Sequence, residues 1–313
     1  MKKSFKVLPM LAVAGLALSS VSVLAQEGPI TVVSREDGSG TRGAFVEIVG
    51  VVDENDDDMT SVSAVIQNST NGVMQTVAGD PAAIGYISLG SLDDSVKPLL
   101  VDGAEATPEA ILAGEYPISR PFNVAWTEES FDEVTQDFLS FIHSAEGQAI
   151  VEGEGYIQVT PAGDAIDGEA TEEEATEEEA TEEEATEEAA TELPSYEAAG
   201  LEGTIEVVGS TSVTPVMEVL AEEYQALNPN VTVNVTSNGS TAGMEAAMNG
   251  TANLGMASRE LSDEEKEVLQ FDAIALDGIA VIVHNDNPLE EISLDNVRAI
   301  FLGELTDWSE LAQ

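Results

Sequence analysis

The sequence predicts an α/β protein of two lobes, and three observations support this expectation. The chain has 313 residues, of which 43% are hydrophobic, so it can bury one or two cores. Short β-branched runs alternate with amphipathic segments through most of the chain, a pattern typical of α/β folds. A glutamate-rich stretch near the middle separates two regions that both show this alternation.

In the first region, the residues from Pro29 to about Gly50 predict a strand, a glycine turn and a short helix. The turn is the segment SREDGSGTR, residues 34–42, and it follows the β-branched run from Ile30 to Val33. Proline at the first helical position predicts another helix start at 107–108. Strands are also expected over 83–88, 99–101 and 122–126, and helices from 70 and over 131–142.

The second region begins with a strand over 204–208, followed by the turn 209–212 and a helix with an apolar face. An alternating strand over 231–235 leads into the turn 237–241 and a second helix, which runs to about Asn249. The remaining elements are expected as strands over 253–256, 273–276 and 279–283 and a helix over 294–301.

The charge of the chain is extreme, with 60 acidic residues against 10 basic ones. This balance argues against a nucleic acid or an anionic membrane surface as a partner. An anion site in such a chain must therefore rely on local dipoles, hydroxyl groups and a few arginines, because the overall field opposes the ligand.

Residues 1–25 are expected to be a secretory signal peptide. Lys2, Lys3 and Lys6 form its basic start, 8–18 its apolar core, and the small residue Ala25 ends the cleavage site. The apolar run is too short to remain as a membrane span. The chain has no cysteine, which excludes disulfides, thiolate metal sites and a lipid-modified N-terminal cysteine. The mature protein is expected to be soluble, in the periplasm or otherwise outside the cytoplasmic membrane.

The stretch 161–200 is expected to be a disordered acidic linker. It contains Glu-Ala-Thr-Glu-Glu units with a period of five residues. Between Asp164 and Glu192 there are fifteen acidic residues and no basic one, so nothing apolar can be buried there. A flexible chain of this length spans roughly 30 Å. The alternative is a tail that recruits a basic partner.

No metal site or cofactor is predicted. The acidic cluster 53–58 lacks the glycine and the final glutamate of a calcium loop, so a solvated loop is expected instead. The two histidines, His143 and His284, lie at the ends of a predicted helix and strand and form no ligand cluster.

The chemistry of the sequence concentrates in turns that each connect a strand to a helix. Three of them share short hydroxyl side chains and free backbone N–H groups at a helix start, at 39–41, 210–212 and 239–241. A fourth turn adds Ser258 and Arg259. Such donors can hold a dehydrated tetrahedral oxyanion without a matching number of positive charges.

The sequence contains no motif that would support an enzymatic function. A serine nucleophile needs a nearby general base, and there is no Gly-x-Ser-x-Gly elbow. The glycine-rich phosphate loop of nucleotide hydrolases is also missing. We therefore expect no catalytic residues and favour an oxyanion receptor over an enzyme, with a phosphatase as a distant third hypothesis.

At these turns the sequence resembles the periplasmic phosphate-binding proteins of phosphate ABC importers. The resemblance is carried by the segments PITVVSREDGSGTRGAF, AIGYISLG, YPISRPFNVAW, GTIEVVGSTSVTPVMEVLAEEY, GTANLGMASREL and DGIAVIVHNDNP. It covers nearly all of the chain outside the signal and the linker. It implies a type II periplasmic-binding fold, in which two α/β lobes joined by two crossovers close over phosphate and deliver it to a membrane permease.

The order of the halves differs from that family. There, the part like 201–313 comes first, and the part like 28–160 follows it. We therefore expect a circular permutation in which the acidic linker joins the old termini. One lobe would comprise about 118–283, with the linker as an insertion, and the other 28–117 plus 284–313. The rival account is a fragment of a tandem protein, whose halves would pair between copies or as a half-swapped dimer instead of within a monomer.

The resemblance also implies roles for individual residues. It places phosphate against one set of hydroxyls and backbone groups: Arg35, Ser39, Gly40, Thr41, Thr211, Ser212, Ser240 and Ser258. Arg35 would be the charge partner of the ligand and Asp37 would hold it in place, while Arg42 and Arg259 would support the site. Related proteins carry a carboxylate where Ser258 stands, and Glu260 or Asp277 could substitute for it.

The leading hypothesis is thus an extracytoplasmic receptor that passes inorganic phosphate to the permease subunits of an ABC importer. Two alternatives stay open. One is a receptor for another tetrahedral oxyanion, and the other is an interaction or sensory module that keeps the fold and docks a partner through its acidic surface.

Overall fold

The structure is a computed structural model and describes residues 27–55, 57–159 and 193–312. The expected signal peptide and most of the expected linker lie outside these residues. Within the described ranges, no helix is long and apolar enough to cross a membrane.

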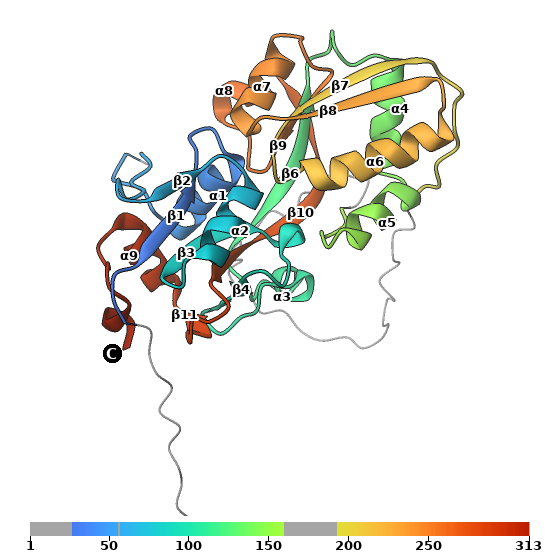
Figure 1. The fold of residues 1–313 in the computed structure, drawn as a ribbon. Coiled ribbons are helices and arrows are strands. Elements are labelled where there is room, and N and C mark those ends of the chain that lie inside the picture. The colour runs from blue at the N-terminus through green and yellow to red at the C-terminus, as the bar shows by residue number, and fades with distance from the viewer. Residues whose placement is uncertain (1–26, 56, 160–192, 313) are drawn as a thin grey trace, which may run out of the picture.

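The described residues form a mixed α/β fold, which confirms the predicted class (Figure 1). The strands are β1 (Thr31–Arg35), β2 (Val65–Gln67), β3 (Ala83–Ser88), β4 (Lys97–Pro98), β5 (Leu100–Val101), β6 (Ser119–Trp126), β7 (Gly203–Gly209), β8 (Val231–Ser237), β9 (Leu254–Ala257), β10 (Gln270–Val283) and β11 (Glu291–Ile292). The α-helices are α1 (Gly40–Val49), α2 (Thr70–Gly79), α3 (Pro108–Leu112), α4 (Glu133–Ile142), α5 (Ala145–Gly153), α6 (Thr214–Leu227), α7 (Ser240–Met248), α8 (Asp263–Lys266) and α9 (Leu294–Leu302). Two 3₁₀ turns cover Leu89–Ser91 and Trp308–Ala312.

The main sheet is continuous across the described chain, in the order β2-β1-β3-β10-β6-β9-β7-β8, with β4 paired to β10. β1 runs parallel to β2 and β3, and β7 runs parallel to β8 and β9. The two parallel groups are joined by β10 and β6, which are antiparallel to each other and to their outer neighbours. By these pairings β1 and β7 run in opposite directions and their carboxyl ends face each other, so the turns that follow them can meet.

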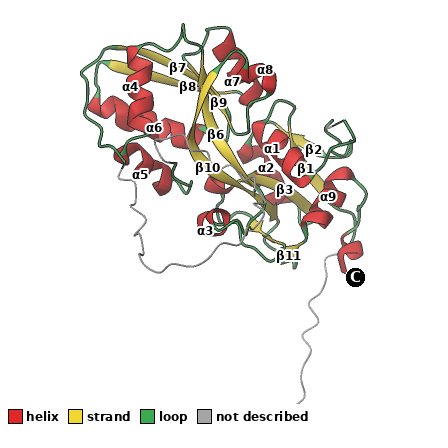
Figure 2. Ribbon diagram, turned by 180° about the vertical axis from the view of Figure 1, so that it is seen from behind, coloured by secondary structure: helices red, strands yellow, loops and turns green. Residues whose placement is uncertain are grey.

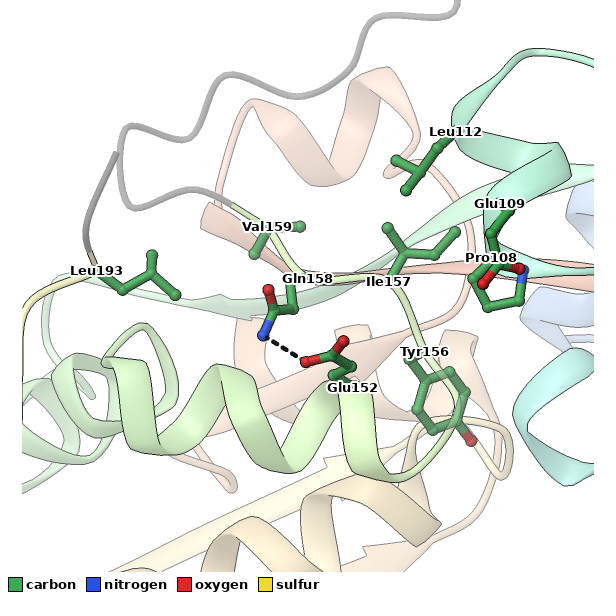
Figure 3. A pocket seen from close by; sticks show the side chains of 9 residues that line it. All are labelled: Pro108, Glu109, Leu112, Glu152, Tyr156, Ile157, Gln158, Val159 and Leu193. Atoms are coloured by element: carbon green, nitrogen blue, oxygen red, sulfur yellow. Dashed lines mark hydrogen bonds between the residues drawn. The ribbon is translucent and has the colours of Figure 1, made fainter. Parts of the chain in front are cut away.

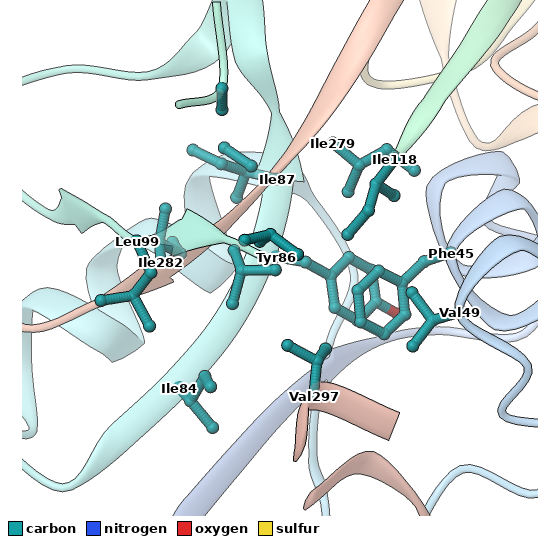
Figure 4. Close-up of a cluster of buried hydrophobic side chains, with 14 of the residues drawn as sticks. Phe45, Val49, Ile84, Tyr86, Ile87, Leu99, Ile118, Ile279, Ile282 and Val297 are labelled. Atoms are coloured by element: carbon teal, nitrogen blue, oxygen red, sulfur yellow. The ribbon is translucent and has the colours of Figure 1, made fainter. Parts of the chain in front are cut away.

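Buried apolar side chains form two large clusters, which include opposite ends of this central pair of strands. The first contains residues from 32–118 and 279–308 together with Ile157, and Tyr86 stacks on Phe45 at its centre with ring centroids 3.9 Å apart (Figure 4). The second contains residues from 122–156 and 205–275. We call the elements around these clusters the first and the second lobe. Figure 2 shows β6 and β10 running from one lobe into the other.

One expected pair of strands is corrected by the structure. The segments 273–276 and 279–283 form a single strand, β10, with an irregularity between Ala273 and Ala275. Asp277 and Gly278 resemble a break in the sequence, but both are strand residues because Asp277 pairs with Arg120 of β6. β10 can therefore belong to both lobes. Helix α5 lies where no helix is expected from the sequence.

The two outer ends of the described chain lie close together, and so do the two residues that flank the acidic stretch. Near the outer ends of the described chain, the Ile30 amide donates to the Thr306 carbonyl over 2.8 Å and the Trp308 amide donates to the Gly28 carbonyl over 2.9 Å. On either side of the acidic stretch, Val159 and Leu193 line one cavity of about 410 Å³ beside α3 and α5 (Figure 3).

Candidate functional site

The turn after β1 begins α1 in the way the sequence predicts. Ser39 is the N-cap of α1, and its hydroxyl accepts a hydrogen bond from the Arg42 amide at 3.4 Å. Gly38, just before it, has φ +82°, a conformation that favours glycine. Gly40 and Thr41 therefore stand at the first turn of a ten-residue helix, where backbone N–H groups are free for a ligand.

In the second lobe, hydrogen bonds connect the turns that follow neighbouring strands. The Ser210 hydroxyl bonds to the Ser258 hydroxyl at 2.8 Å, and the Ser258 amide donates to the Ser240 hydroxyl at 3.1 Å. Ser212 and Ser258 are fully buried. Three segments that follow β7, β8 and β9 thus supply one cluster of short hydroxyl groups.

The two lobes meet at these turns. The Thr41 hydroxyl lies 2.8 Å from the Ser212 hydroxyl, and the Arg35 Nη2 group donates to Thr211 Oγ1 over 2.9 Å. The Thr241 amide also donates to the Gly38 carbonyl over 3.1 Å. The structure therefore brings Arg35, Gly40 and Thr41 of the first lobe against a group of residues of the second, Thr211, Ser212, Ser240 and Ser258. Ser39, the remaining predicted ligand residue, lies beside them as the N-cap of α1.

Arg35 supplies the positive charge at this junction, although only 2% of it is exposed. Glu36 holds it in a bidentate ion pair, with Nε to Oε2 and Nη2 to Oε1 both at 2.8 Å. The prediction that Asp37 holds Arg35 is not what the structure shows. Asp37 instead pairs with Arg42 at 2.7 Å, and its side chain is 96% exposed, whereas Arg35 is buried.

The two supporting arginines lie next to the site with their charges engaged. Arg42 binds Asp37 and Asp58, and it also donates to the Arg35 carbonyl over 3.0 Å. Arg259 forms a bidentate pair with Glu265 at 2.7 and 2.8 Å. In this state both arginines stabilise the turns, and Arg35 is the guanidinium that reaches across the junction.

Neither carboxylate suggested as a substitute at Ser258 bonds to a predicted ligand residue in the described chain. Asp277 accepts from Ser88 at 3.0 Å and from Arg120 at 2.9 Å, and burial raises its pKa while Arg120 opposes this rise. Glu260 is exposed, and its carboxylate lies 3.9 Å from Lys266. The cluster that faces α1 therefore consists of hydroxyl groups, which can both donate and accept.

Sequence reasoning missed two residues of this junction and a buried tyrosine behind it. Glu36 pairs with Arg35, and the Thr70 hydroxyl accepts from Arg35 Nη1 at 3.5 Å. The Tyr86 hydroxyl lies 2.8 Å from that of Ser34, and burial raises its pKa to about 12. Thr70 could have been found, because it also stands at a helix start that follows a strand. Tyr86 carried no such signal.

The described residues contain no group of three or more His, Cys, Asp or Glu side chains that could hold a metal ion. What the junction offers is hydroxyl groups, backbone N–H groups and one guanidinium. This set of donors suits an oxyanion rather than a cation.

Comparisons with known proteins agree with this chemistry. A family model described as PBP superfamily domain matches residues 18–146 and 170–313. The phosphate-binding protein PstS 2 of Streptococcus pneumoniae is 44% identical over 296 residues, which cover 94% of this chain and 91% of that protein. The phosphate-binding protein PstS of Pseudomonas aeruginosa is 36% identical over 118 residues, which cover only 35% of this chain and 36% of that relative.

A solved structure is similar as well. It is the crystal structure of a phosphate ABC transporter, phosphate-binding protein from Streptococcus pneumoniae, with 46% sequence identity and a TM-score of 0.67. The match covers 91% of this chain and 100% of that one. The chain therefore belongs to the PBP superfamily and, within it, to the phosphate-binding proteins named PstS.

Proposed function

We propose that this protein is an extracytoplasmic phosphate receptor that serves a phosphate ABC importer. The observation that carries the proposal is the junction of the lobes, where Arg35 reaches Thr211 and Thr41 reaches Ser212 among buried hydroxyl groups. The similar proteins are named for phosphate binding, and the similar solved structure for phosphate ABC transport.

The arrangement suggests how phosphate would be held. In the structure the hydroxyl groups bond to one another, so a ligand would replace these contacts with hydrogen bonds to its own oxygens. The first turn of α1 would add backbone N–H groups, and Arg35 would add a charged donor. Because both lobes contribute, the ligand would bind most tightly to the closed form and would shift the protein toward it.

We also propose that the chain is a circular permutation within its family, with lobe boundaries near residues 118 and 283. The match to the Pseudomonas aeruginosa protein covers about a third of each chain, which supports this, since reversed halves allow only one half to align at a time. The near-complete match to the Streptococcus pneumoniae protein implies that this relative has the same order. The neighbouring chain ends described above give further support.

Calorimetry on the chain from residue 26 onward tests the proposed function. Phosphate should release heat at a stoichiometry of one, and the double variant Ser39→Ala/Thr41→Ala should lose most of the affinity. The matched control is Thr204→Ala/Thr232→Ala, which removes two exposed threonines that are paired across β7 and β8. If phosphate gives no heat while sulfate or another oxyanion does, phosphate is the wrong ligand.

A further inference from the structure

Ser210 lies directly beside the proposed phosphate site, although it is not among the predicted ligand residues. It is 2% exposed and stands between the end of β7 and the turn that leads into α6. Its amide donates to the Met256 carbonyl of β9 over 3.0 Å, and its carbonyl accepts from the Thr214 hydroxyl of α6 at 2.8 Å. The position of Ser210 is therefore set by β9 on one side and by α6 on the other.

The hydrogen bonds of the Ser210 hydroxyl group determine which partner donates in each of them. Its oxygen lies 3.2 Å from the Ser212 amide nitrogen and 3.4 Å from the Val213 amide nitrogen, so it accepts from two N–H groups. A serine hydroxyl has two acceptor positions and one proton. With both acceptor positions in use, the Ser210 proton is the group that bonds to the Ser258 hydroxyl oxygen, at 2.8 Å.

Ser258 is thus the acceptor in this bond, and its own proton is left to donate to another group. A Cβ atom at Gly40 would lie 2.7 Å from Ser258 Oγ and would overlap the Ser240 hydroxyl, so both hydroxyl groups face the first turn of α1. The Ser240 hydroxyl also accepts, from the Ser258 amide at 3.1 Å, and keeps its proton. Both protons can therefore be directed at an oxyanion that lies between α1 and these two serines.

The bond between Ser210 and Ser258 is compatible with a bound ligand. It lies within the second lobe, and both side chains are almost completely buried, so water does not compete for it. The contacts that a ligand would displace are those between the lobes, such as the one from Thr41 to Ser212. The donor direction of Ser258 would therefore persist when the lobes enclose phosphate.

From these contacts we infer that Ser210 is a positioning residue for phosphate and that it acts through Ser258. Because Ser210 donates to the Ser258 oxygen, the Ser258 proton is directed toward the ligand, and phosphate meets a donor that is already oriented. This inference rests on the proposed function, because it concerns the same phosphate site.

A double-mutant cycle, measured by calorimetry with inorganic phosphate, tests the inference. Ser258→Ala removes a donor to a charged ligand and should lower phosphate affinity about tenfold. Ser210→Ala allows the Ser258 hydroxyl to turn away from the ligand and should lower the affinity about fivefold. Because Ser210 acts through Ser258, the double variant should bind about as weakly as Ser258→Ala alone.

The outcomes of this cycle separate the inference from the proposed function. An additive loss in the double variant, about fiftyfold, would overturn the inference, and so would unchanged binding in either single variant. In these cases the parent chain still binds phosphate, so the proposed function stands. If the parent chain gives no heat with phosphate, both are overturned.

Ser144→Ala is the matched control, which separates positioning from a loss of stability. Ser144 is 1% exposed, accepts from the Gly147 amide at 3.1 Å as the N-cap of α5, and donates to the Phe141 carbonyl over 2.6 Å. It resembles Ser210 in burial and in bonding, but it has no hydrogen bond to a predicted ligand residue in the described chain. Ser144→Ala should lower the melting temperature as Ser210→Ala does and leave phosphate affinity unchanged. Equal losses of affinity in the two variants would overturn the inference.

Ser210→Cys takes the place of Ser210→Ala if the alanine variant folds poorly. The thiol occupies a similar space but is a weak donor and a weak acceptor, so the same cycle with Ser258→Ala applies. The loss of phosphate affinity caused by Ser210→Cys should disappear when Ser258 is already alanine. A loss that persists in that background would contradict a role through Ser258.

Discussion

At the level of single residues, the site depends on how closely Gly40 approaches the second lobe. A Cβ atom at this position would overlap the Ser240 hydroxyl and lie 2.7 Å from Ser258 Oγ. Both serines are fully buried, so neither side chain has free space to retreat. The absence of a side chain at Gly40 therefore allows the lobes to come together.

The substitution Gly40→Ala tests this explanation. It should lower phosphate affinity at least tenfold, about 1.4 kcal/mol, because the added methyl group opposes closure. The melting temperature without ligand should change little, since the methyl group can be accommodated when the lobes separate. Calorimetry and thermal unfolding measure the two effects. Gly79→Ala is the control, because a Cβ there meets no atom within 4 Å; unchanged phosphate binding in Gly40→Ala would refute the argument.

Residues also show the limits of prediction from sequence. The turns at 39–41, 210–212 and 239–241 were found because glycine and hydroxyl residues at a helix start are local signals. The resemblance implies Asp37 as the partner of Arg35, whereas the structure pairs Arg35 with Glu36 and Asp37 with Arg42. The direction of each side chain depends on turn angles that the sequence does not display. The opposition of the turns across the two lobes came from the family resemblance and not from spacing.

At the level of elements, β6 and β10 explain how two cores share one sheet. Asp277 and Arg120 are directly opposed in the ladder, and both side chains are almost completely buried between the lobes. The sequence predicts separate strands over 273–276 and 279–283, and Asp277-Gly278 resembles a break between them because a charge and a glycine rarely occupy a central strand. The guanidinium on β6 is a long-range partner, and pattern analysis along one segment could not reveal it.

Removing one member of this pair should be costly. Asp277→Ala leaves Arg120 buried without its counter-charge, so the free energy of unfolding should fall by about 3–5 kcal/mol. The double variant Asp277→Leu/Arg120→Met removes both charges and should recover most of this loss. Urea unfolding measures each value. A double variant as unstable as Asp277→Ala would contradict this account. The loss in free energy of unfolding would then arise from altered packing of the side chains and not from an unpaired charge.

At the level of the whole molecule, both cores are assembled from distant parts of the chain. The core of the first lobe combines residues before 119 and after 278 with Ile157, and the core of the second combines 122–156 with 205–275. The residues that flank the acidic stretch are both fixed to the α5 region: the Val159 amide donates to Gln148 Oε1 over 2.8 Å, and the Ala145 amide donates to the Pro194 carbonyl over 2.8 Å. The two ends of the acidic stretch therefore lie close enough that a short connection could join them.

This geometry predicts that the order of the halves can be exchanged without loss of function. A chain that starts at residue 193, continues through 312 into 27 by a short glycine-rich connector and ends at 159 should remain monomeric and bind phosphate as the parent does. The connector has little distance to cover, because Gly28 and Trp308 already share a hydrogen bond. Loop-closure entropy changes by only about 0.6 kcal/mol for each doubling of loop length, so exchanging one loop for another should alter stability slightly.

Solution mass and calorimetry on the reordered chain measure this outcome. The control is the pair of separate fragments, 27–159 and 193–312, produced together; they should associate, because β6 of one fragment lies between β9 and β10 of the other. A reordered chain that forms obligate dimers, or that folds without binding phosphate while the parent binds it, would favour exchange of halves between copies. A monomer that binds phosphate would mean that the contacts between the halves, and not their order in the chain, determine the receptor.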